Sequence, residues 1–176
     1  MLNSKKQNNQ SRIIVKPYKV SRQQSETPKD CMESVEFMSG VLRNNSERTY
    51  CISNHIKNPD NLLSNPQKIG RQFNIHQNKL FGDEKIRGKR VYSLVYNFSN
   101  ENYPIDFDEA SLFAQSLLEK YPDYKSVAAI SEQANGDINV GIIFDNYSND
   151  GSHKMTKDFR PYHGTNIYNT IISHGH

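Results

Sequence analysis

Long apolar runs and cysteines are both scarce in this chain of 176 residues. Its mean hydropathy is −0.82, and no apolar run approaches the roughly 20 residues that cross a bilayer, which excludes a membrane span. No apolar segment follows the positive charges of residues 1–6, so we expect no secretion signal and a cytoplasmic protein without a membrane partner. Cys31 and Cys51 are too few for a disulfide scaffold and lack metal-ligand spacing, so we expect reduced thiols.

The length of the chain favours a single domain, because 176 residues can bury one core and a few added helices. Residues 1–12 are polar and rich in Asn, Gln, Ser and Lys, with nothing to pack. We therefore expect a disordered tail over residues 1–12 and one domain over residues 13–176.

The first half of this domain predicts one strand and three helices. Residues 12–17 are a short β-branched run closed by a proline, which is typical of an edge strand. Apolar side chains recur at helical spacing over residues 29–42, and again over residues 48–57 before an Asn-Pro pair. A third helix is expected to start near Pro66 and to run toward His76.

The second half begins with clearer signals. Residues 90–98 are aromatic and β-branched, as strands are. Asp106 and Glu109 then have the spacing of a capping box, and the apolar side chains that follow share one helical face as far as Tyr121. This part therefore predicts a central strand followed by an amphipathic helix.

A hairpin and a last helix complete the predicted order. Residues 126–131 and 137–144 read as strands, and the Asn135-Gly136 pair between them favours a tight turn. Residues 162–172 predict a final helix. This order predicts an α+β fold, with a mainly antiparallel sheet and helices packed on one face.

The strand predicted over residues 137–144 has two different faces. Its even-numbered residues from 138 to 144 are apolar and share one face, while Asn139 and Gly141 share the other. Any chemistry of this sheet is therefore expected on the side of Asn139 and Gly141.

Basic residues cluster locally although the net charge is only +3. Lys85, Arg87, Lys89 and Arg90 are closely spaced, and a phosphate backbone responds to a local cluster more than to the total charge. Charge alone leaves two interpretations open, a nucleic-acid contact and a solvated turn.

Taken in order, these segments resemble the relaxase, or mobilization nuclease, family, whose members nick one DNA strand at the transfer origin of a plasmid or integrative element. The resemblance spans residues 13–174. It lies in the opening Ile-Val-Lys-Pro strand, the short helix before Asn58-Pro59, the strand over residues 92–98, the Asp-Glu-Ala helix start at residues 108–110 and the strand over residues 136–144. It implies a relaxase-like palm, a role in conjugative mobilization of a mobile element, and single-stranded DNA and other mobilization proteins as partners.

The same resemblance implies a metal site. The last strand of the family typically reads Gly-His-Ile-His-Asn-His-Ile-Ile-Phe, and its alternating histidines hold a divalent metal that polarises the scissile phosphate. Those histidine positions are Asp137, Asn139 and Gly141 here, and an upstream family histidine matches Glu132. Glu132, Asp137 and Asn139 are therefore the implied oxygen ligands for Mg²⁺ or Mn²⁺ in an active protein. The residues alone leave open that Asp137 follows a turn and that Glu132 is solvated.

The family nucleophile is a tyrosine on the short helix, whose phenolate forms a covalent link to DNA. Counting back from Asn58-Pro59, that position holds His55, and Tyr50 lies more than one turn away on the same predicted helix. The family also places DNA-contacting loop residues near the end of the domain. Here they correspond to Lys154, Lys157 and Arg160.

Two functions follow, from different classes. The first is a relaxase-like DNA-binding pseudoenzyme that needs no cofactor and contacts phosphates through seven basic residues, namely Lys85, Arg87, Lys89, Arg90, Lys154, Lys157 and Arg160. The second is a divergent relaxase, a DNA-nicking transesterase or endonuclease that uses Tyr50 or His55 as nucleophile. A third option is a remnant of a mobile element without present activity. The first two functions differ in whether Tyr50 lies close to the metal ligands, because reacting groups must come within about 3–3.5 Å of the phosphate between them.

Overall fold

The computed structural model describes residues 18–19, 29–44, 46–82, 86 and 88–175. The tail expected over residues 1–12 and the strand expected over residues 12–17 lie outside this part of the chain. The described elements are β1 (Tyr18–Lys19), α2 (Lys29–Arg43), β2 (Ser46–Asn54), α3 (Asn61–Ser64), α4 (Pro66–Phe81), β3 (Val91–Phe98), α5 (Phe107–Glu119), β4 (Ser126–Gln133), β5 (Ile138–Asp145), α6 (Met155–Asp158) and α7 (Pro161–Gly175).

The strands form one five-stranded sheet in the order β1-β3-β5-β4-β2, and every neighbouring pair is antiparallel. The predicted β4–β5 hairpin is confirmed. The backbone N–H of Gly136 donates to the carbonyl of Gln133 at 3.0 Å, and Gly136 has a φ of 89°, which side chains with a Cβ rarely adopt. An antiparallel sheet with packed helices confirms the α+β class.

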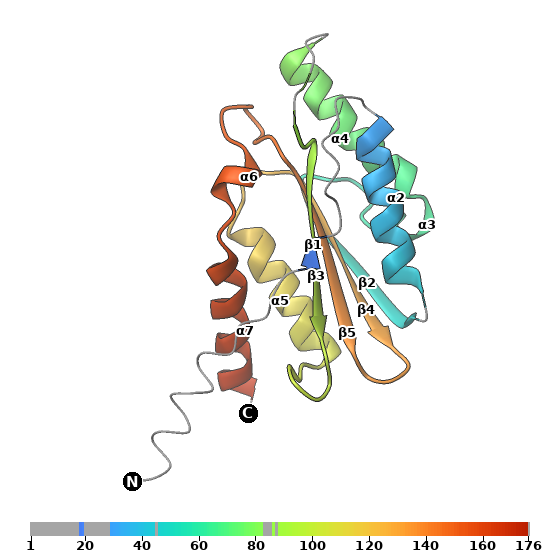
Figure 1. Cartoon of the computed structure of the whole chain (residues 1–176), viewed down its shortest axis with the longest axis vertical. Coiled ribbons are helices and arrows are strands. Elements are labelled where there is room, and N and C mark those ends of the chain that lie inside the picture. The colour runs from blue at the N-terminus through green and yellow to red at the C-terminus, as the bar shows by residue number, and fades with distance from the viewer. Residues whose placement is uncertain (1–17, 20–28, 45, 83–85, 87, 176) are drawn as a thin grey trace.

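Helices lie on both sides of the sheet (Figure 1). On one side, α5 and α7 pack on a cluster that includes Leu94, Phe113 and Ile142. On the other, α2, α3 and α4 pack on a cluster that includes Phe73 and Ile143. The prediction of helices on one face was wrong in this detail.

The physical reason for the two helical layers lies in the central strands. The four residues from Val127 to Ile130 are all apolar and fully buried, and alternate members belong to opposite clusters. A strand with apolar side chains on both faces needs a cover on both faces, so a second helical layer is required.

Residues 46–54 form β2, so the helix predicted over residues 48–57 is wrong. Each residue from Arg48 to Asn54 pairs with a residue of β4. Cys51 and Ile52, which the helical pattern placed on one side, point to opposite faces of the sheet. Aromatic and β-branched side chains such as Tyr50 and Ile52 suit this half-buried strand.

The remaining helix predictions are confirmed. α5 begins with a full capping box, in which Glu109 N donates to Asp106 Oδ1 and Asp106 N donates to Glu109 Oε1. α4 and α7 run somewhat further than predicted, to Phe81 and Gly175. Cys31 and Cys51 are both buried, and no disulfide joins them, as expected. Within the described residues, no helix combines the length and apolar character needed to cross a membrane.

Candidate functional site

The second face of β5 is covered by α2 at the position where the resemblance places a metal-binding histidine. A Cβ atom added at Gly141 would stand 2.7 Å from Leu42 Cδ1 and 2.8 Å from Met38 Sδ. Asn139, at the next position on this face, is partly exposed, and its Oδ1 accepts a 2.6 Å hydrogen bond from Asn97 Nδ2. α2 therefore fills the space that a histidine and its metal would need above Gly141.

The three expected metal ligands do not converge. Glu132 pairs with Ile138 across the hairpin, so the two side chains share a face that is opposite to the face of Asn139. Asp137 lies in the turn, where its Oδ1 accepts a 2.9 Å hydrogen bond from the backbone N–H of Asn100. Among the described residues, no group of three or more His, Cys, Asp or Glu side chains could hold a metal ion.

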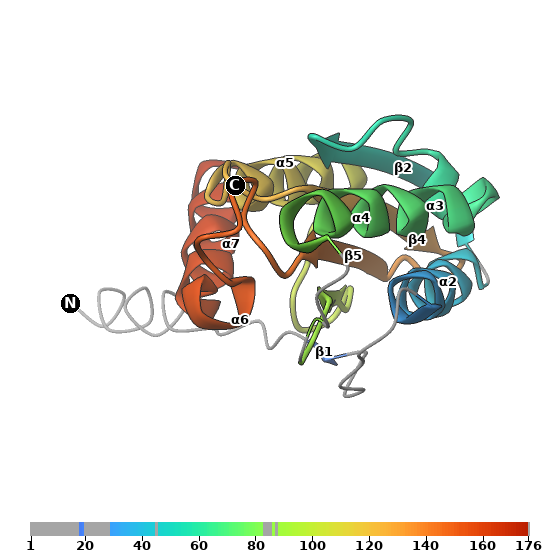
Figure 2. The ribbon, with the colours of Figure 1, turned by 90° about the horizontal axis from the view of Figure 1, so that it is seen from above.

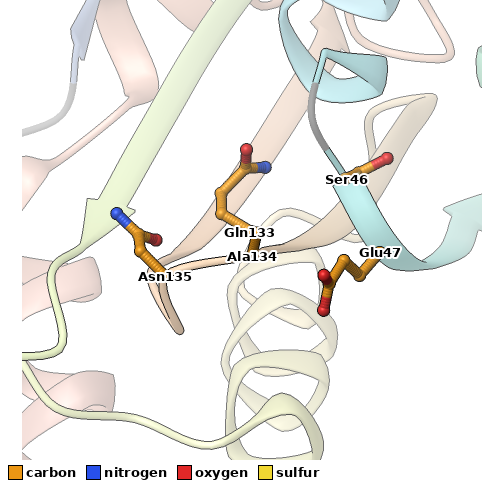
Figure 3. A pocket seen from close by; sticks show the side chains of 5 residues that line it. All are labelled: Ser46, Glu47, Gln133, Ala134 and Asn135. Atoms are coloured by element: carbon orange, nitrogen blue, oxygen red, sulfur yellow. The ribbon is translucent and has the colours of Figure 1, made fainter.

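A hollow of about 530 Å³ lies next to the hairpin turn, where β2 begins (Figure 3). Its lining residues are Ser46, Glu47, Gln133, Ala134 and Asn135. None of the three expected ligands lines it, and Glu47 supplies its single carboxylate. Since Mg²⁺ is usually held by carboxylates together with phosphate or water oxygens, this lining gives little support for a metal site.

Tyr50 and His55 lie at the edge of the sheet, away from Asn139. Tyr50 pairs with Ile130, which pairs with Val140, so these three side chains share the α5 face. Asn139 points to the α2 face of β5, and β4 separates β5 from β2 by a backbone distance of about 10 Å. The residues expected as nucleophiles therefore do not face the residue expected as ligand.

The basic residues that were expected to contact DNA lie in different environments. Lys85 and Arg87 lie outside the described residues. Lys89 Nζ lies 5.8 Å from the ring centroid of Tyr92. Arg90 is only 3% exposed, which removes its side chain from contact with a phosphate backbone.

The second expected basic group is at the surface. Lys154 and Lys157 are exposed, and Lys154 Nζ lies 5.6 Å from the ring of Tyr147. Arg160 is also exposed, but its Nη1 donates a 2.6 Å hydrogen bond to the carbonyl of Lys157. Of the three, Lys154 and Lys157 keep their charged groups available to a phosphate.

Arg90 belongs to a buried polar network between α4 and the ends of β3 and β5. Asp145 is fully buried and accepts hydrogen bonds from His76 Nδ1 at 2.6 Å and from Gln77 Nε2 at 2.9 Å. Arg90 Nε donates to Gln77 Oε1 at 2.8 Å. Burial raises the pKa of Asp145, and the hydrogen bonds from His76 and from the backbone of Tyr147 oppose that rise.

This network fixes α4 rather than forming a reactive centre. The second ring nitrogen of His76, Nε2, lies 3.3 Å from the carbonyl oxygen of Asn149. Both ring nitrogens therefore already have partners, so His76 has no nitrogen left to accept a proton from a nucleophile. His76 and Gln77 instead hold the inner side of α4 against the sheet.

The outer side of α4 is basic, a feature that the sequence interpretation missed. Lys68, Arg71 and Lys79 are exposed and have no ion-pair partner among the described residues. Lys57 lies next to them, because the side chain of Gln72 bonds its backbone N–H and C=O at 2.8 Å each. The chain has no Asp or Glu from residue 61 to residue 82, a signal that was present in the sequence.

A groove separates β2 from α5. It has a volume of about 560 Å³ and is lined by Tyr50, Cys51, Ile52, Ser53, Asn54, Gln115, Leu118, Glu119 and Pro122. That volume lies within the range of about 300–1,000 Å³ that is usual for ligand pockets. At one end, His55 adopts a φ of 61°, and its Nε2 donates a 3.0 Å hydrogen bond to the carbonyl oxygen of Pro122. Tyr50 thus lines the groove, and His55 lies next to it through its bond to Pro122.

Comparison of the chain with protein-family models, with curated proteins and with solved structures finds no match. The resemblance to relaxases remains a prediction from the sequence, and the function must be argued from the geometry.

Proposed function

We propose that this protein is a relaxase-like DNA-binding protein of a mobile element, without strand-nicking activity, and that it binds single-stranded DNA through the outer side of α4. The observation that supports this proposal best is the basic surface formed by Lys57, Lys68, Arg71 and Lys79, defined here as the α4 surface, three of whose cations lie in the acid-free stretch over residues 61–82. Free cations gathered on one side of a rigid helix are suited to bind a phosphate backbone.

The packing behind α4 supports this role. A phosphate-binding surface needs a fixed geometry, and His76 and Gln77 attach α4 to buried Asp145 and Arg90 on its inner side. The exposed side is therefore presented by a helix whose rotation is set by hydrogen bonds. Since none of the four basic side chains of the α4 surface has an ion-pair partner in the described part of the chain, no protein carboxylate competes with a phosphate there.

The arrangement of the expected catalytic residues supports the absence of nicking activity in this proposal. Tyr50 points to the α5 face and Asn139 to the α2 face. Glu132 also points away from Asn139, and α2 covers Gly141. A single phosphate would have to lie within about 3–3.5 Å of both nucleophile and metal, and these side chains do not face a common point.

The proposal is tested by fluorescence anisotropy with a labelled single-stranded oligonucleotide over a range of salt concentrations. One variant combines K68E, R71E and K79E. A charge-matched control combines K120E, K154E and K157E, whose lysines are also exposed. We expect the α4 variant to lose at least about tenfold in affinity at low salt. Its log-log salt slope should fall by about 2, at about 0.7 per lost contact with a single strand.

Three outcomes would contradict the proposal. Failure of the unmodified protein to bind DNA would remove the DNA-binding function. A larger loss in the control than in the α4 variant would move the binding surface to α6. A covalent protein–DNA adduct on a denaturing gel with Mg²⁺ or Mn²⁺, lost in Tyr50→Phe or His55→Ala, would establish the divergent relaxase instead.

A further inference from the structure

The outer edge of β2 is unpaired in the described part of the chain. β2 has nine residues and pairs along one side with β4. Apart from this pairing with β4, the backbone groups of residues 46–54 make no backbone hydrogen bond to a described residue. β2 lies at the rim of the molecule (Figure 2), and Glu47 to Tyr50 are exposed. An open strand edge is a template for the addition of another strand.

The usual protections of an edge strand are weak here. Natural edges carry outward charges, prolines or bulges that prevent pairing with another chain. β2 has its irregularity only at its start, between Ser46 and Arg48, and residues 49–54 include no charge, proline or glycine. The one nearby cation, Arg48, lies 4.0 Å above the ring of Phe107 on α5 and so is turned away from the edge. No described segment therefore covers this edge.

A groove next to the open edge offers side-chain contacts in addition to backbone pairing. Tyr50 is 52% exposed and forms one wall with Ile52, and Leu118 and Pro122 lie on the opposite side. A strand added beside β2 would direct every second side chain toward the α5 side, because strand side chains alternate. The combination of a strand edge with a groove under a helix is the usual geometry of peptide recognition by strand addition.

The lining of the groove restricts the chemistry of the partner. Glu119 is the single charged residue among the described residues that line it, and it is exposed. An anionic backbone such as DNA would be repelled there, whereas a Lys or Arg side chain would be attracted. Ile52 and Leu118 favour an apolar side chain at the neighbouring position on the same face. The preferred partner thus has an apolar residue and a basic residue two positions apart.

The geometry points to β2 and the α5 groove as a binding site for an extended peptide segment of another protein, which adds to the sheet as a sixth strand. The segment carries an apolar side chain against Ile52 and Leu118, and a Lys or Arg, two residues away, against Glu119. Tyr50 packs over the apolar side chain. His55 donates a hydrogen bond to the carbonyl oxygen of Pro122, which lines the groove.

The test uses two pools of nine-residue synthetic peptides with a Leu or Val at position 4. The first pool has Lys or Arg at position 6, the second has Glu there, and the other positions are uncharged β-formers. Binding is measured by isothermal titration with the full chain, and hydrogen exchange maps the amides that become protected. We expect the basic pool to bind at least about tenfold more tightly than the acidic pool, with protection over residues 47–54.

Three variants then test whether the peptide binds beside β2 and in the α5 groove. E119K should reverse the preference between the two pools. Glu119 is exposed, and its Oε1 accepts a 3.2 Å hydrogen bond from Gln115 on the same helix. I52K should abolish binding, whereas T49K is a matched control on the other face of the same strand and should leave it within about twofold. Thermal unfolding of each variant shows whether it is folded.

Four results would overturn the inference. The first is no binding of either pool. The second is equal binding of both pools, or binding unaffected by E119K. The third is protection elsewhere than β2. The fourth is a concentration-dependent dimer with β2 amides protected in the absence of peptide, which would make a second copy of this chain the occupant of the edge.

Discussion

The two faces of the sheet are held to their helices in different ways. On the α5 and α7 face the contact is made by aromatic rings, and Phe113 lies 4.9 Å from Tyr96 and 5.1 Å from Phe98 between ring centroids. On the α2 and α4 face an apolar centre is flanked by polar groups, with the Asp145 network at one end and the Asn97–Asn139 pair at the other. The first face is stabilised mainly by burial, with hydrogen bonds between Tyr121 and His163 and from Tyr168 to the carbonyl of Pro104 beside the rings. The second face also fixes the rotation of α4, through hydrogen bonds that are buried.

This difference has a functional meaning. Apolar contacts tolerate rotation of a helix more readily than directional hydrogen bonds do, since burial is not directional. α4, which has the proposed phosphate-binding surface, is on the face with the directional contacts. Three substitutions test this difference between the two faces.

The largest effect is expected for Phe113→Ala on the aromatic face. Phe113 is fully buried, and its removal leaves a cavity among rings that cannot close fully. We expect a loss of about 3–5 kcal/mol in the free energy of unfolding, measured by urea denaturation. Leu112→Ala is the matched control, because Leu112 is 51% exposed and should cost below about 0.5 kcal/mol. Equal effects of the two substitutions would contradict the assigned core.

The next effect is expected for Asp145→Asn on the α4 face. The substitution removes the buried carboxylate that pairs with His76 and accepts a hydrogen bond from Gln77, so the network that reaches buried Arg90 through Gln77 loses its anion. We expect a loss of about 3 kcal/mol in the free energy of unfolding, also by urea denaturation. DNA affinity should fall more than it does in Phe113→Ala at a temperature where both are folded.

Asp137→Asn serves as the control for that prediction. Asp137 also accepts a backbone hydrogen bond, but it lies in a partly exposed turn and has no buried cation beside it. We expect a cost of about 1 kcal/mol. If Asp145→Asn and Phe113→Ala weakened DNA binding equally, the directional contacts of α4 would have no special role.

The smallest effect is expected for Gly141→Ala on the same face. The new methyl group would meet Leu42 Cδ1 and Met38 Sδ, which are the ends of flexible side chains and can shift. We expect a loss of about 1 kcal/mol, at the low end for overpacking. Gly40→Ala, in α2 with nothing within 4 Å, should instead stabilise by about 0.5–1 kcal/mol. A stabilising Gly141→Ala would show that α2 does not cover this position tightly.

Local signals predicted much of this fold. The capping box of α5 and the Asn135-Gly136 turn each depend on residues that are close together in the sequence, and both were predicted correctly. The helical spacing of Ile52 and Ile56 was misleading, because the pairing of β2 with β4 is set by residues about 80 positions away. The apolar run from Val127 to Ile130 indicated burial on both faces, and it was not used to predict the second helical layer.

The candidate sites were harder to predict for the same reason. Which face Glu132 shares with its neighbours depends on the register of the hairpin, and the cover over Gly141 depends on where α2 packs. Arg90 looked like part of a surface cluster, and only its contact with Gln77 shows that it is buried. The acid-free stretch over residues 61–82 was the one signal of the α4 surface that the sequence offered.

The position of β2 in the sheet also has a consequence for how the chain folds. The β4–β5 hairpin closes across a short turn, whereas β2 pairs with β4 across the intervening α3, α4, β3 and α5, and such distant pairings form slowly. Until β2 arrives, β4 is itself the open edge, with apolar side chains on both faces. That transient edge is a far greater aggregation hazard than the polar strand that finally covers it. We therefore expect the pairing of β2 to protect the edge of β4 from aggregation while the chain folds. Deletion of residues 46–54 should cause the newly made protein to aggregate.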